Sequence, residues 1–354
     1  QLGMKAPLLV TDPGLAALPM VDQVLQQLRE AGLRADIFSK VKGNPTGGNV
    51  ADGVAALKAG EHDGVIAFGG GSAIDAAKSI ALIAHQSCSL WDAQNPANVD
   101  ASKMLPVIAV PTTAGTGSEV GQAAVITDEE SHAKRIIFHG KMMPPIVILD
   151  PELTVGLPAK LTAATGMDAL AHNLEALYAP VYHPMAEGIA MEGIRLIKEY
   201  LPRATRDGSD IEARLNMLVA SSMGATAFQR GLGAIHAVSH SVGALYDSHH
   251  GLLNAIVMPY VLQANRDAIG AEMERLGRYL GLSQPNYDGV LQWVLDFRKE
   301  LDIPHTLADI GVDDSKAELV GKMSAKDVTA RTNAVQLDAA QYQELFLKAL
   351  NGVI

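Results

Sequence analysis

The chain up to Asp150 alternates between short apolar runs and longer stretches whose apolar residues recur at helical spacing. We expect strands over 7–10, 35–38, 64–68, 105–110 and 146–149, and helices over 21–31, 50–59 and 73–84. Strands that alternate with helices in this way build a parallel sheet. Two more apolar runs, 122–127 and 135–138, predict a β-hairpin inserted before the last strand. The N-terminal half is therefore predicted to be an α/β domain with a Rossmann-like parallel sheet.

Beyond Asp150 the pattern changes to stretches rich in leucine, alanine, methionine and glutamate that repeat with helical period. Prolines are expected to interrupt these helices, and they stand at positions 158, 184, 202, 259 and 304. We therefore expect an all-α C-terminal domain. The boundary is expected between Leu153 and Pro158, which gives domains over 1–154 and 155–354.

Length and composition agree with two packed domains, because 354 residues exceed the usual size of one hydrophobic core and 48% of them are hydrophobic. The net charge of −11, with no run of lysine or arginine, argues against binding of nucleic acid or of an anionic membrane surface. No apolar stretch of the sequence is long enough to cross a bilayer. Small molecules are the expected ligands.

The chain contains a single cysteine, Cys88. One thiol excludes an intrachain disulfide and a thiolate metal cluster, and it fits a protein of the reducing cytoplasm. The chain begins at Gln1 and not at methionine, so we expect N-terminal residues to be missing from this sequence.

Asp168 and His172 lie four residues apart in a stretch of helix formers, Thr165–His172. Residues at this spacing stand one above the other on a helix face, so a carboxylate oxygen and an imidazole nitrogen can reach the same ion. The alternative is a capping or hydrogen-bonded pair without a metal. The spacing therefore makes this stretch a candidate metal-binding helix.

A second group of histidines favours the metal. Four of the 11 histidines stand between positions 236 and 250, in a stretch that is otherwise mainly apolar or glycine. If His236 and His250 join Asp168 and His172, the site has three nitrogen ligands and one carboxylate. Such a set suits Fe(II) and Zn(II) alike.

Two loops in the N-terminal half follow strands and are rich in glycine or hydroxyl groups. Gly69–Ser72 joins a strand to a helix, where glycine lets the backbone approach a phosphate and points N–H groups at it. Pro111–Ser118 also follows a strand, and its threonines can donate to phosphate or ribose. The glycine loop alone also fits a tight strand-to-helix turn, but together the two loops match the edge at which open α/β sheets bind ligands. The two loops predict a nucleotide ligand.

A divalent ion and a nucleotide bound by one chain together predict hydride transfer. The ion would act as a Lewis acid on an alcohol or carbonyl oxygen, while a nicotinamide takes or gives the hydride. His240, one helical turn beyond His236, is the candidate to pass the hydroxyl proton to solvent, because imidazole titrates near neutral pH. The alternative for His240 is a core histidine satisfied by hydrogen bonds.

Several motifs are spread along nearly the whole chain. They are Asn44-Pro45-Thr46, Gly69-Gly70-Gly71-Ser72 with Asp75 and Lys78, Pro111–Thr116, Ala164–Leu170, and Gly231-Leu232-Gly233 followed by His236, His240 and His250-Gly251. Together they resemble the iron-dependent (group III) alcohol dehydrogenases, which have a dehydroquinate synthase-like fold. The resemblance implies an NAD-dependent enzyme with Fe(2+), or Zn(2+), that acts on a small primary alcohol or aldehyde. It also implies a homodimer or higher homo-oligomer.

The resemblance further implies roles for individual residues. Asp168, His172, His236 and His250 would bind the metal, and His240 would be the catalytic residue that lines the site without binding the metal. Asp12 matches the position that contacts the adenosine ribose, where a negative charge favours NAD over NADP by repelling a 2′-phosphate. The other implied cofactor contacts are Asn44, Gly70, Gly71, Ser72, Asp75, Thr112, Thr113, Thr116 and Lys134.

The chain departs from the family pattern at its N-terminus and around the substrate pocket. It lacks the strand-and-turn segment that normally precedes the strand at Leu8 and that often pairs between subunits. The pocket phenylalanine, Phe228, is followed by Gln229 and Arg230 instead of small or amide residues. Arg331 lies in a stretch where many relatives have glycines and an Asn-Pro pair. The two arginines predict a substrate with a carboxylate or sulfonate, and a structural salt bridge is the alternative.

Three other functions share some of these features. A maleylacetate-reductase-like enzyme has the same fold but works without a metal, and the intact set of Asp168 and three histidines argues against it. A dehydroquinate-synthase-like lyase also uses NAD and a metal, but it brings a glutamate and several lysines into its site, whereas the ligand helix here carries Asp168. A regulator that binds metal or nucleotide without turnover would need neither His240 nor both cofactor loops.

Overall fold

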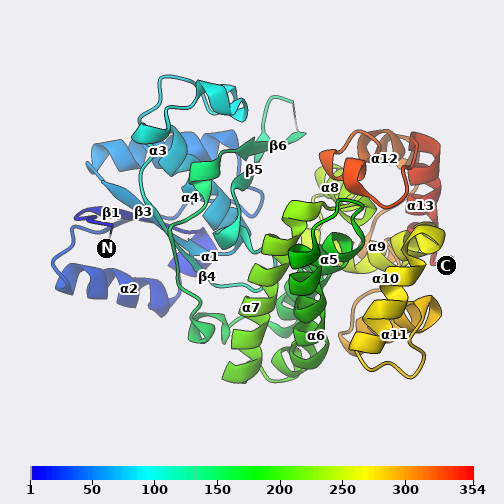
Figure 1. The fold of residues 1–354 in the computed structure, drawn as a ribbon. Coiled ribbons are helices and arrows are strands. Elements are labelled where there is room, and N and C mark those ends of the chain that lie inside the picture. The colour runs from blue at the N-terminus through cyan, green and yellow to red at the C-terminus, as the bar shows by residue number, and fades with distance from the viewer. Residues whose placement is uncertain (1, 132) are drawn as a thin grey trace. The chain divides into compact units, whose positions relative to one another are not determined.

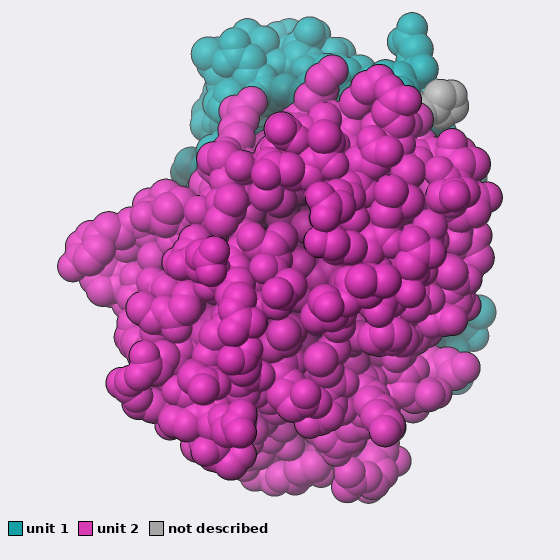
Figure 2. Space-filling view, turned by 90° about the vertical axis from the view of Figure 1, so that its right-hand side faces the viewer, with its two compact units in different colours: residues 1–113, 117–154 teal, residues 114–116, 155–354 magenta. Residues whose placement is uncertain are grey.

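The structure is a computed structural model that describes residues 2–131 and 133–354. The chain divides into two compact units, which Figure 2 colours separately. The first unit runs up to Thr113 and continues over Gly117–Thr154, and the second holds Ala114–Thr116 and Val155–Ile354. In the described ranges, no helix is both long enough and apolar enough to span a membrane.

The first unit contains the predicted parallel sheet. Its five strands are β1 Pro7–Val10, β2 Asp36–Phe38, β3 Gly64–Gly69, β4 Val107–Pro111 and β7 Ile146–Val147. They lie in the order β2-β1-β3-β4-β7, and each neighbouring pair is parallel. The separate strands β5 Ala123–Asp128 and β6 Ala133–Phe138 pair antiparallel, which confirms the predicted hairpin. Because β2 and β3 lie on opposite sides of β1, the strand order reverses between β1 and β3, and ligands bind at such a point in open α/β sheets.

Helices cover both faces of this sheet (Figure 1). Leu8 and Val10 of β1 pack with α3 Gly47–Ala59 and α4 Gly71–Ile83, whereas Leu9 packs with α2 Pro19–Glu30. α4 begins two residues before the predicted start at Ala73, because Gly70 is extended and caps it. The short elements are α1 Pro13–Ala16, η1 Asp92–Gln94, η2 Pro96–Asn98, η3 Ala101–Lys103, η4 Ser118–Val120, η5 Gly140–Met142 and η6 Pro151–Thr154.

The second unit is helical, as predicted. Its helices are α5 Ala159–Tyr178, α6 Pro184–Arg206, α7 Ile211–Ala227, α8 Ala234–Tyr246, α9 His250–Ala264, α10 Arg266–Tyr279, α11 Tyr287–Glu300, α12 Ala317–Ser324 and α13 Ala339–Asn351, with the turns η7 Phe228–Arg230, η8 Ala308–Ile310 and η9 Val328–Thr332. Pro184 opens α6, but Pro202 and Pro259 lie inside α6 and α9, so the predicted breaks there are wrong. A proline removes one backbone hydrogen bond, and in both helices the buried neighbours keep the helix continuous.

Glycines let other helices approach α5 closely. A Cβ added to Gly251 of α9 would lie 2.4 Å from the Ala164 carbonyl oxygen and 3.1 Å from Asp168 Cβ. A Cβ at Gly224 of α7 would lie 3.1 Å from His172 Cβ. These contacts place the first turn of α9 directly against the part of α5 that carries Asp168.

Candidate metal centre and cofactor-binding residues

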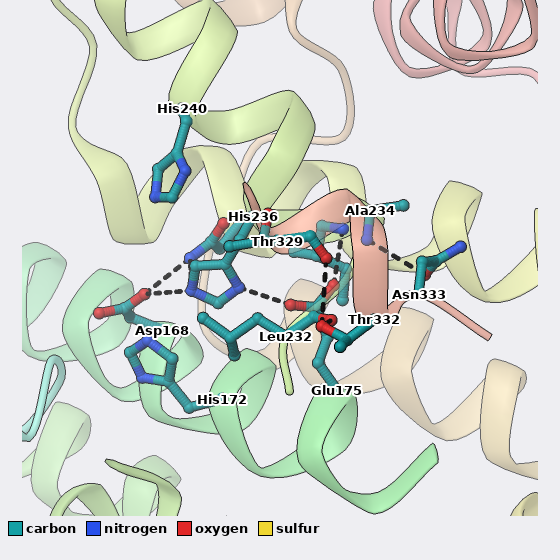
Figure 3. Close-up of polar contacts among 12 residues, drawn as sticks. Asp168, His172, Glu175, Leu232, Ala234, His236, His240, Thr329, Thr332 and Asn333 are labelled. Carbon is teal, nitrogen blue, oxygen red and sulfur yellow. Dashed lines mark hydrogen bonds and ion pairs between the residues drawn. The ribbon is translucent and has the colours of Figure 1, made fainter. Parts of the chain in front are cut away.

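Three of the predicted metal ligands lie together inside the second unit. Asp168 and His172 stand on α5 and His236 in the first turn of α8, and one ligand atom of each lies within 4.8 Å of the others. All three residues are buried. Figure 3 shows Asp168 and His172 next to the ring of His236. The helical spacing thus places two polar side chains on the same buried face of α5.

His250 joins this cluster, and His249 does not. His250 is the first residue of α9, and its Nε2 lies 3.5 Å from Asp168 Oδ1. Its ring centroid lies 5.3 Å from that of His236. The exposed His249 instead caps α9 by accepting a hydrogen bond from the Leu252 nitrogen at 3.3 Å. The structure therefore brings all four predicted ligands into one region.

The hydrogen bonds of His172 and His236 fix which ring nitrogen is left for a metal. His172 Nδ1 donates to the carbonyl oxygen of Gly115, 3.3 Å away. His236 Nδ1 lies 2.6 Å from a carboxylate oxygen of Glu175 and donates to it. With the hydrogen on Nδ1, the neutral form of each ring has its lone pair on Nε2, as metal-binding imidazoles require.

Asn254 reveals how well this region suits a cation. Its Nδ2 lies 2.7 Å from Asp168 Oδ1, 3.2 Å from His236 Nε2 and 3.1 Å from His250 Nε2. Two amide hydrogens cannot satisfy three acceptors, and the buried Oδ1 of Asn254 has no hydrogen-bond partner among the described residues. Converging acceptors of this kind are satisfied by a divalent cation, so the donor set fits Fe(2+) or Zn(2+).

The two stacked histidines have opposite pKa shifts. Burial lowers the pKa of His172 to about 4, and the nearby charge of Asp168 only partly offsets this. Burial also lowers the pKa of His236, but the charge and hydrogen bond of Glu175 raise it by more, so the net pKa lies above the usual value. His172 is therefore neutral at pH 7, the form in which it can bind a metal.

His240 lies beside the cluster and is held by a carboxylate. Its ring stacks on that of His250, with centroids 5.3 Å apart. Its Nδ1 lies 3.0 Å from Asp327 Oδ2 and donates to it, so Nε2 is the nitrogen that can exchange a proton with a bound molecule. Burial raises the pKa of Asp327, but the hydrogen bond and charge of His240 lower it by more, so the net pKa lies below the usual range.

Two predicted cofactor residues lie at the carboxyl edge of the sheet in the first unit. Asp12 follows β1 and caps α1 by accepting a hydrogen bond from the Leu15 nitrogen at 2.9 Å. Gly69 ends β3 with a φ of 151°, and a Cβ there would lie 3.7 Å from Asp12 Oδ2. No side chain of the described residues caps α4 at Gly70, so the first N–H groups of this helix can bind an anion. The edge thus offers N–H groups and, beside them, one negative charge.

Other predicted cofactor residues surround the same glycine turn. Thr112 and Thr113 follow β4, and Thr113 Oγ1 would lie 3.3 Å from a Cβ at Gly70. Ser72 donates its hydroxyl hydrogen to the carbonyl oxygen of Gly43, which ties the start of α4 to the loop before α3. These contacts explain why small residues are needed at this edge.

The remaining cofactor predictions fall on separate elements. Asp75 on α4 accepts a hydrogen bond from the Val125 nitrogen at 2.8 Å and pairs with Lys78 at 3.3 Å. Asn44 lies in the loop before α3, Lys134 lies on β6, and Thr116 belongs to the second unit. The contacts of Asp75 anchor the hairpin, and they leave its predicted cofactor role a prediction.

Arg230 is engaged by backbone and carboxylate oxygens. Its Nη1 donates to the carbonyl oxygens of Ala176 at 3.0 Å and Leu177 at 2.6 Å, and its Nε donates to that of Val181. Its Nη2 pairs with Glu187 at 3.0 Å. The guanidinium thus caps the end of α5, and these contacts favour the structural salt bridge over an anion-binding role for Arg230.

Phe228 and Arg331 lie in different surroundings. The half-buried ring of Phe228 lies 5.0 Å from that of His172, so it forms an apolar surface beside the cluster. Arg331 is exposed on η9, and in the described part of the chain its guanidinium has no hydrogen bond or ion pair. η9 is held to the segment before α8 by Thr332, which donates to the Leu232 carbonyl oxygen at 2.7 Å.

Three residues of this site were not predicted from the sequence: Glu175, Asn254 and Asp327. Glu175 follows His172 by three residues and Asn254 follows His250 by four, so helical spacing could have indicated both. Asp327 lies 87 residues from His240, and no local pattern connects them.

Comparison with known proteins identifies the family of this chain. The model for iron-containing alcohol dehydrogenase matches residues 1–151, and that for the Fe-containing alcohol dehydrogenase family, C-terminal, matches residues 162–350. A 4-hydroxybutyrate dehydrogenase of Cupriavidus necator is 39% identical over 99% of this chain and 94% of its own. The NAD-dependent methanol dehydrogenase of Bacillus methanolicus is 38% identical over 94% of this chain and 89% of its own. A 1,3-propanediol oxidoreductase structure matches with a TM-score of 0.93 and 35% identity, covering 99% of this chain and 93% of that one. The chain therefore belongs to the iron-containing alcohol dehydrogenase family.

Proposed function

We propose that this chain is an alcohol dehydrogenase that transfers a hydride between NAD(H) and a small primary alcohol or aldehyde with the help of one divalent metal ion. The observation that carries the proposal is the convergence of Asp168, His172 and His236, whose ligand atoms lie within 4.8 Å of one another. His250 adds a fourth ligand, with its Nε2 3.5 Å from Asp168 Oδ1. The named relatives, a 4-hydroxybutyrate and a methanol dehydrogenase, support the same reaction class.

These four residues would hold Fe(2+), or Zn(2+). When bound, the ion supplies a Lewis acid for the alcohol or carbonyl oxygen. Phe228 supplies an apolar wall next to His172 and excludes water from that side. His240 holds or accepts the hydroxyl proton at Nε2, because Asp327 fixes its Nδ1 as a donor.

The first unit would bind NAD at the carboxyl edge of its sheet. The uncapped N-terminus of α4 suits the pyrophosphate, and glycines at this turn allow the backbone to approach it. Asp12 lies beside this turn, where its charge would repel the 2′-phosphate of NADP. Asn44, Ser72, Asp75, the threonines 112, 113 and 116, and Lys134 are the further proposed contacts.

We also propose that the substrates include alcohols with an anionic group. One relative is named for 4-hydroxybutyrate, whose carboxylate lies at the other end from its hydroxyl group. Arg331 supports this, because it is exposed and lies on η9. Asp327 immediately precedes η9 in the chain and accepts the hydrogen bond from His240. Arg230 gives no support, because carbonyl oxygens and Glu187 already surround it.

We propose a homodimer or higher homo-oligomer in the cytoplasm as the working form. The family resemblance supports the oligomer, and the single cysteine, Cys88, which is free, fits a reducing compartment.

The test is metal analysis and turnover of anaerobically purified protein. We expect one divalent ion per chain and formation of NADH, followed by its absorbance, with a panel of neutral and acidic primary alcohols. Asp168→Ala should lose the ion and lower kcat/KM by at least roughly a thousandfold, because about 4 kcal/mol of Lewis-acid stabilisation is lost. Asp267→Ala, which removes an exposed carboxylate from α10, is the control and should change neither.

Two results would contradict the proposal. Turnover that survives a strong chelator would instead support a metal-independent reductase. A metal-loaded protein that oxidises none of the alcohols would support a binding function without turnover.

A further inference from the structure

Glu175 is a fully buried carboxylate on the same helix as two of the proposed ligands. It follows Asp168 by seven residues and His172 by three, so all three side chains lie on one face of α5. Its exposed fraction is 0%. Burying a carboxylate is costly unless its oxygens receive hydrogen bonds, so its partners should reveal why it is there.

Both oxygens of Glu175 are used at the N-terminus of α8. Oε1 accepts a hydrogen bond from the Ile235 nitrogen at 2.7 Å, and Oε2 accepts one from His236 Nδ1 at 2.6 Å. The N-cap residue, Gly233, has no side chain to offer, and a Cβ there would lie only 3.0 Å from Glu175 Oε1. A glycine at this position therefore makes room for a carboxylate that comes from another helix.

The bond to Glu175 determines how His236 faces the cluster. Figure 3 shows Glu175 and Asp168 on opposite sides of the His236 ring. With its hydrogen on Nδ1, His236 turns the lone pair of Nε2 towards Asp168 Oδ1, 4.0 Å away. Two acceptors that face each other at this distance repel, and the Asn254 amide group beside them is also shared with His250, so a cation would make the arrangement more favourable.

The charges of the region point the same way. Asp168 and Glu175 are both acidic residues, and both are buried. Two carboxylates match the charge of one divalent ion, whereas without an ion they repel each other in a poorly solvated interior.

We propose that Glu175 is a positioning residue for the metal: by accepting the Nδ1 hydrogen of His236 it fixes the tautomer and orientation in which His236 Nε2 binds the ion. The inference rests on the proposed metal site. Carboxylates that hold a ligand histidine in this way strengthen the metal affinity of proteins by about tenfold to a hundredfold. The simpler role for Glu175 is to cap α8 and nothing more.

Asn333 offers a control that separates these two roles. Its Oδ1 accepts a hydrogen bond from the Ala234 nitrogen at 3.1 Å, so it caps the same helix end as Glu175. Its other partners are Asn265 and the Val335 carbonyl oxygen, and none of its bonds within the described residues involves a histidine. Loss of Asn333 should weaken the cap without changing His236.

The experiment measures Zn(2+) affinity of the metal-free full-length protein by competition with a chromophoric chelator, for wild type, Glu175→Gln and Asn333→Ala. A glutamine at 175 still fits, but its amide group must face either His236 Nδ1 or the Ile235 nitrogen. Facing Nδ1, it drives the imidazole hydrogen to Nε2, where it blocks metal binding. We expect Glu175→Gln to weaken Zn(2+) binding by about tenfold to a hundredfold. Asn333→Ala should lower the melting temperature but leave the affinity within about threefold.

The outcomes are distinguishable. If wild type takes up no zinc, both the proposed function and this inference fail. If wild type binds zinc but Glu175→Gln binds it equally well, or Asn333→Ala loses as much affinity, only the inference fails. Should Glu175→Gln not fold, the two-bond ¹H–¹⁵N spectrum of metal-free wild type labelled with ¹⁵N-histidine decides instead. In the neutral form of the His236 ring, a proton on Nδ1 supports the inference, and a proton on Nε2 overturns it.

Discussion

Lys78 in the first unit and Glu175 in the second are both charged residues with an exposed fraction of 0%, yet their surroundings differ in kind. Lys78 is enclosed by acceptors alone: its Nζ donates to the Ser118 hydroxyl at 2.6 Å and to the carbonyl oxygens of Ser118, Gly121 and Ala123, and it pairs with Asp75 at 3.3 Å. Its hydrogens have complementary partners, so this buried charge holds α4 to the hairpin and needs no ligand.

Glu175 also receives two hydrogen bonds, but its partner His236 faces a group of acceptors that do not have enough donors. Beyond the His236 ring, an imidazole lone pair, a second imidazole and the Asp168 carboxylate face one another around the single amide group of Asn254. Burial of a charge alone therefore does not mark a functional site. The distinguishing feature is a set of acceptors that only a cation can satisfy.

Replacement of Lys78 is the strongest test of this difference. Lys78→Met should lower the free energy of unfolding by roughly 3–5 kcal/mol, because it leaves Asp75 without its cation and several buried carbonyl groups without a donor. Chemical denaturation measures this loss. Zinc affinity of the metal-free protein should be unchanged, and Lys58→Met, at an exposed position on α3, should alter neither quantity. A weaker zinc affinity in Lys78→Met would break the comparison.

The fold follows from the sequence more completely than the site does. Alternation of apolar runs with amphipathic stretches predicted the strands β1, β3 and β4 to within two residues at each end, because parallel strands buried on both faces are almost continuously apolar. The start of α4 was misplaced, because glycines read as loop also form the first turn of a helix. Pro202 and Pro259 were misjudged because the packing that tolerates them is tertiary.

For the site, local spacing brought out Asp168 with His172, and a cluster of histidines brought out His236 and His250. The residues around them depend on which helix face is buried, and Glu175 in isolation looks like any helical surface glutamate. Arg230 is a residue whose contacts the sequence did not reveal, for the same reason. Its neighbours in the sequence suggest a pocket, but the guanidinium bonds to the end of α5, a partner that only the tertiary fold brings close.

The protonation of His172 gives a second test of the comparison, through the pH dependence of stability. Its pKa is about 4 in the folded protein and 6.5 when unperturbed. Between these values the unfolded state binds more protons, so this contribution to stability is complete above pH 6.5 and is lost as the pH falls towards 4. The contribution of His172 to the free energy of unfolding is at most about 3 kcal/mol, at about 1.4 kcal/mol per pKa unit.

Urea denaturation of metal-free wild type and His172→Gln across this range measures the effect. The free-energy difference between the two proteins should shrink by about 3 kcal/mol as the pH falls, whereas His85→Gln, at an exposed position, should follow wild type throughout. A difference that stays constant with pH would mean that His172 is not held in its neutral form by burial.

Arg331 gives the smallest expected effect and tests the opposite case, a cation without partners. Arg230 is surrounded by oxygen atoms, as Lys78 is, whereas the exposed guanidinium of Arg331 has no partner in residues 2–131 and 133–354. If it binds the anionic end of the substrate, Arg331→Ala should lower kcat/KM for 4-hydroxybutyrate by roughly tenfold, or about 1.4 kcal/mol, and leave that for 1-butanol within about twofold. Arg331→Lys should keep part of the preference, because it keeps the charge but loses the bidentate geometry. Equal losses for both substrates would show that Arg331 supports η9 and does not read the charge of the substrate.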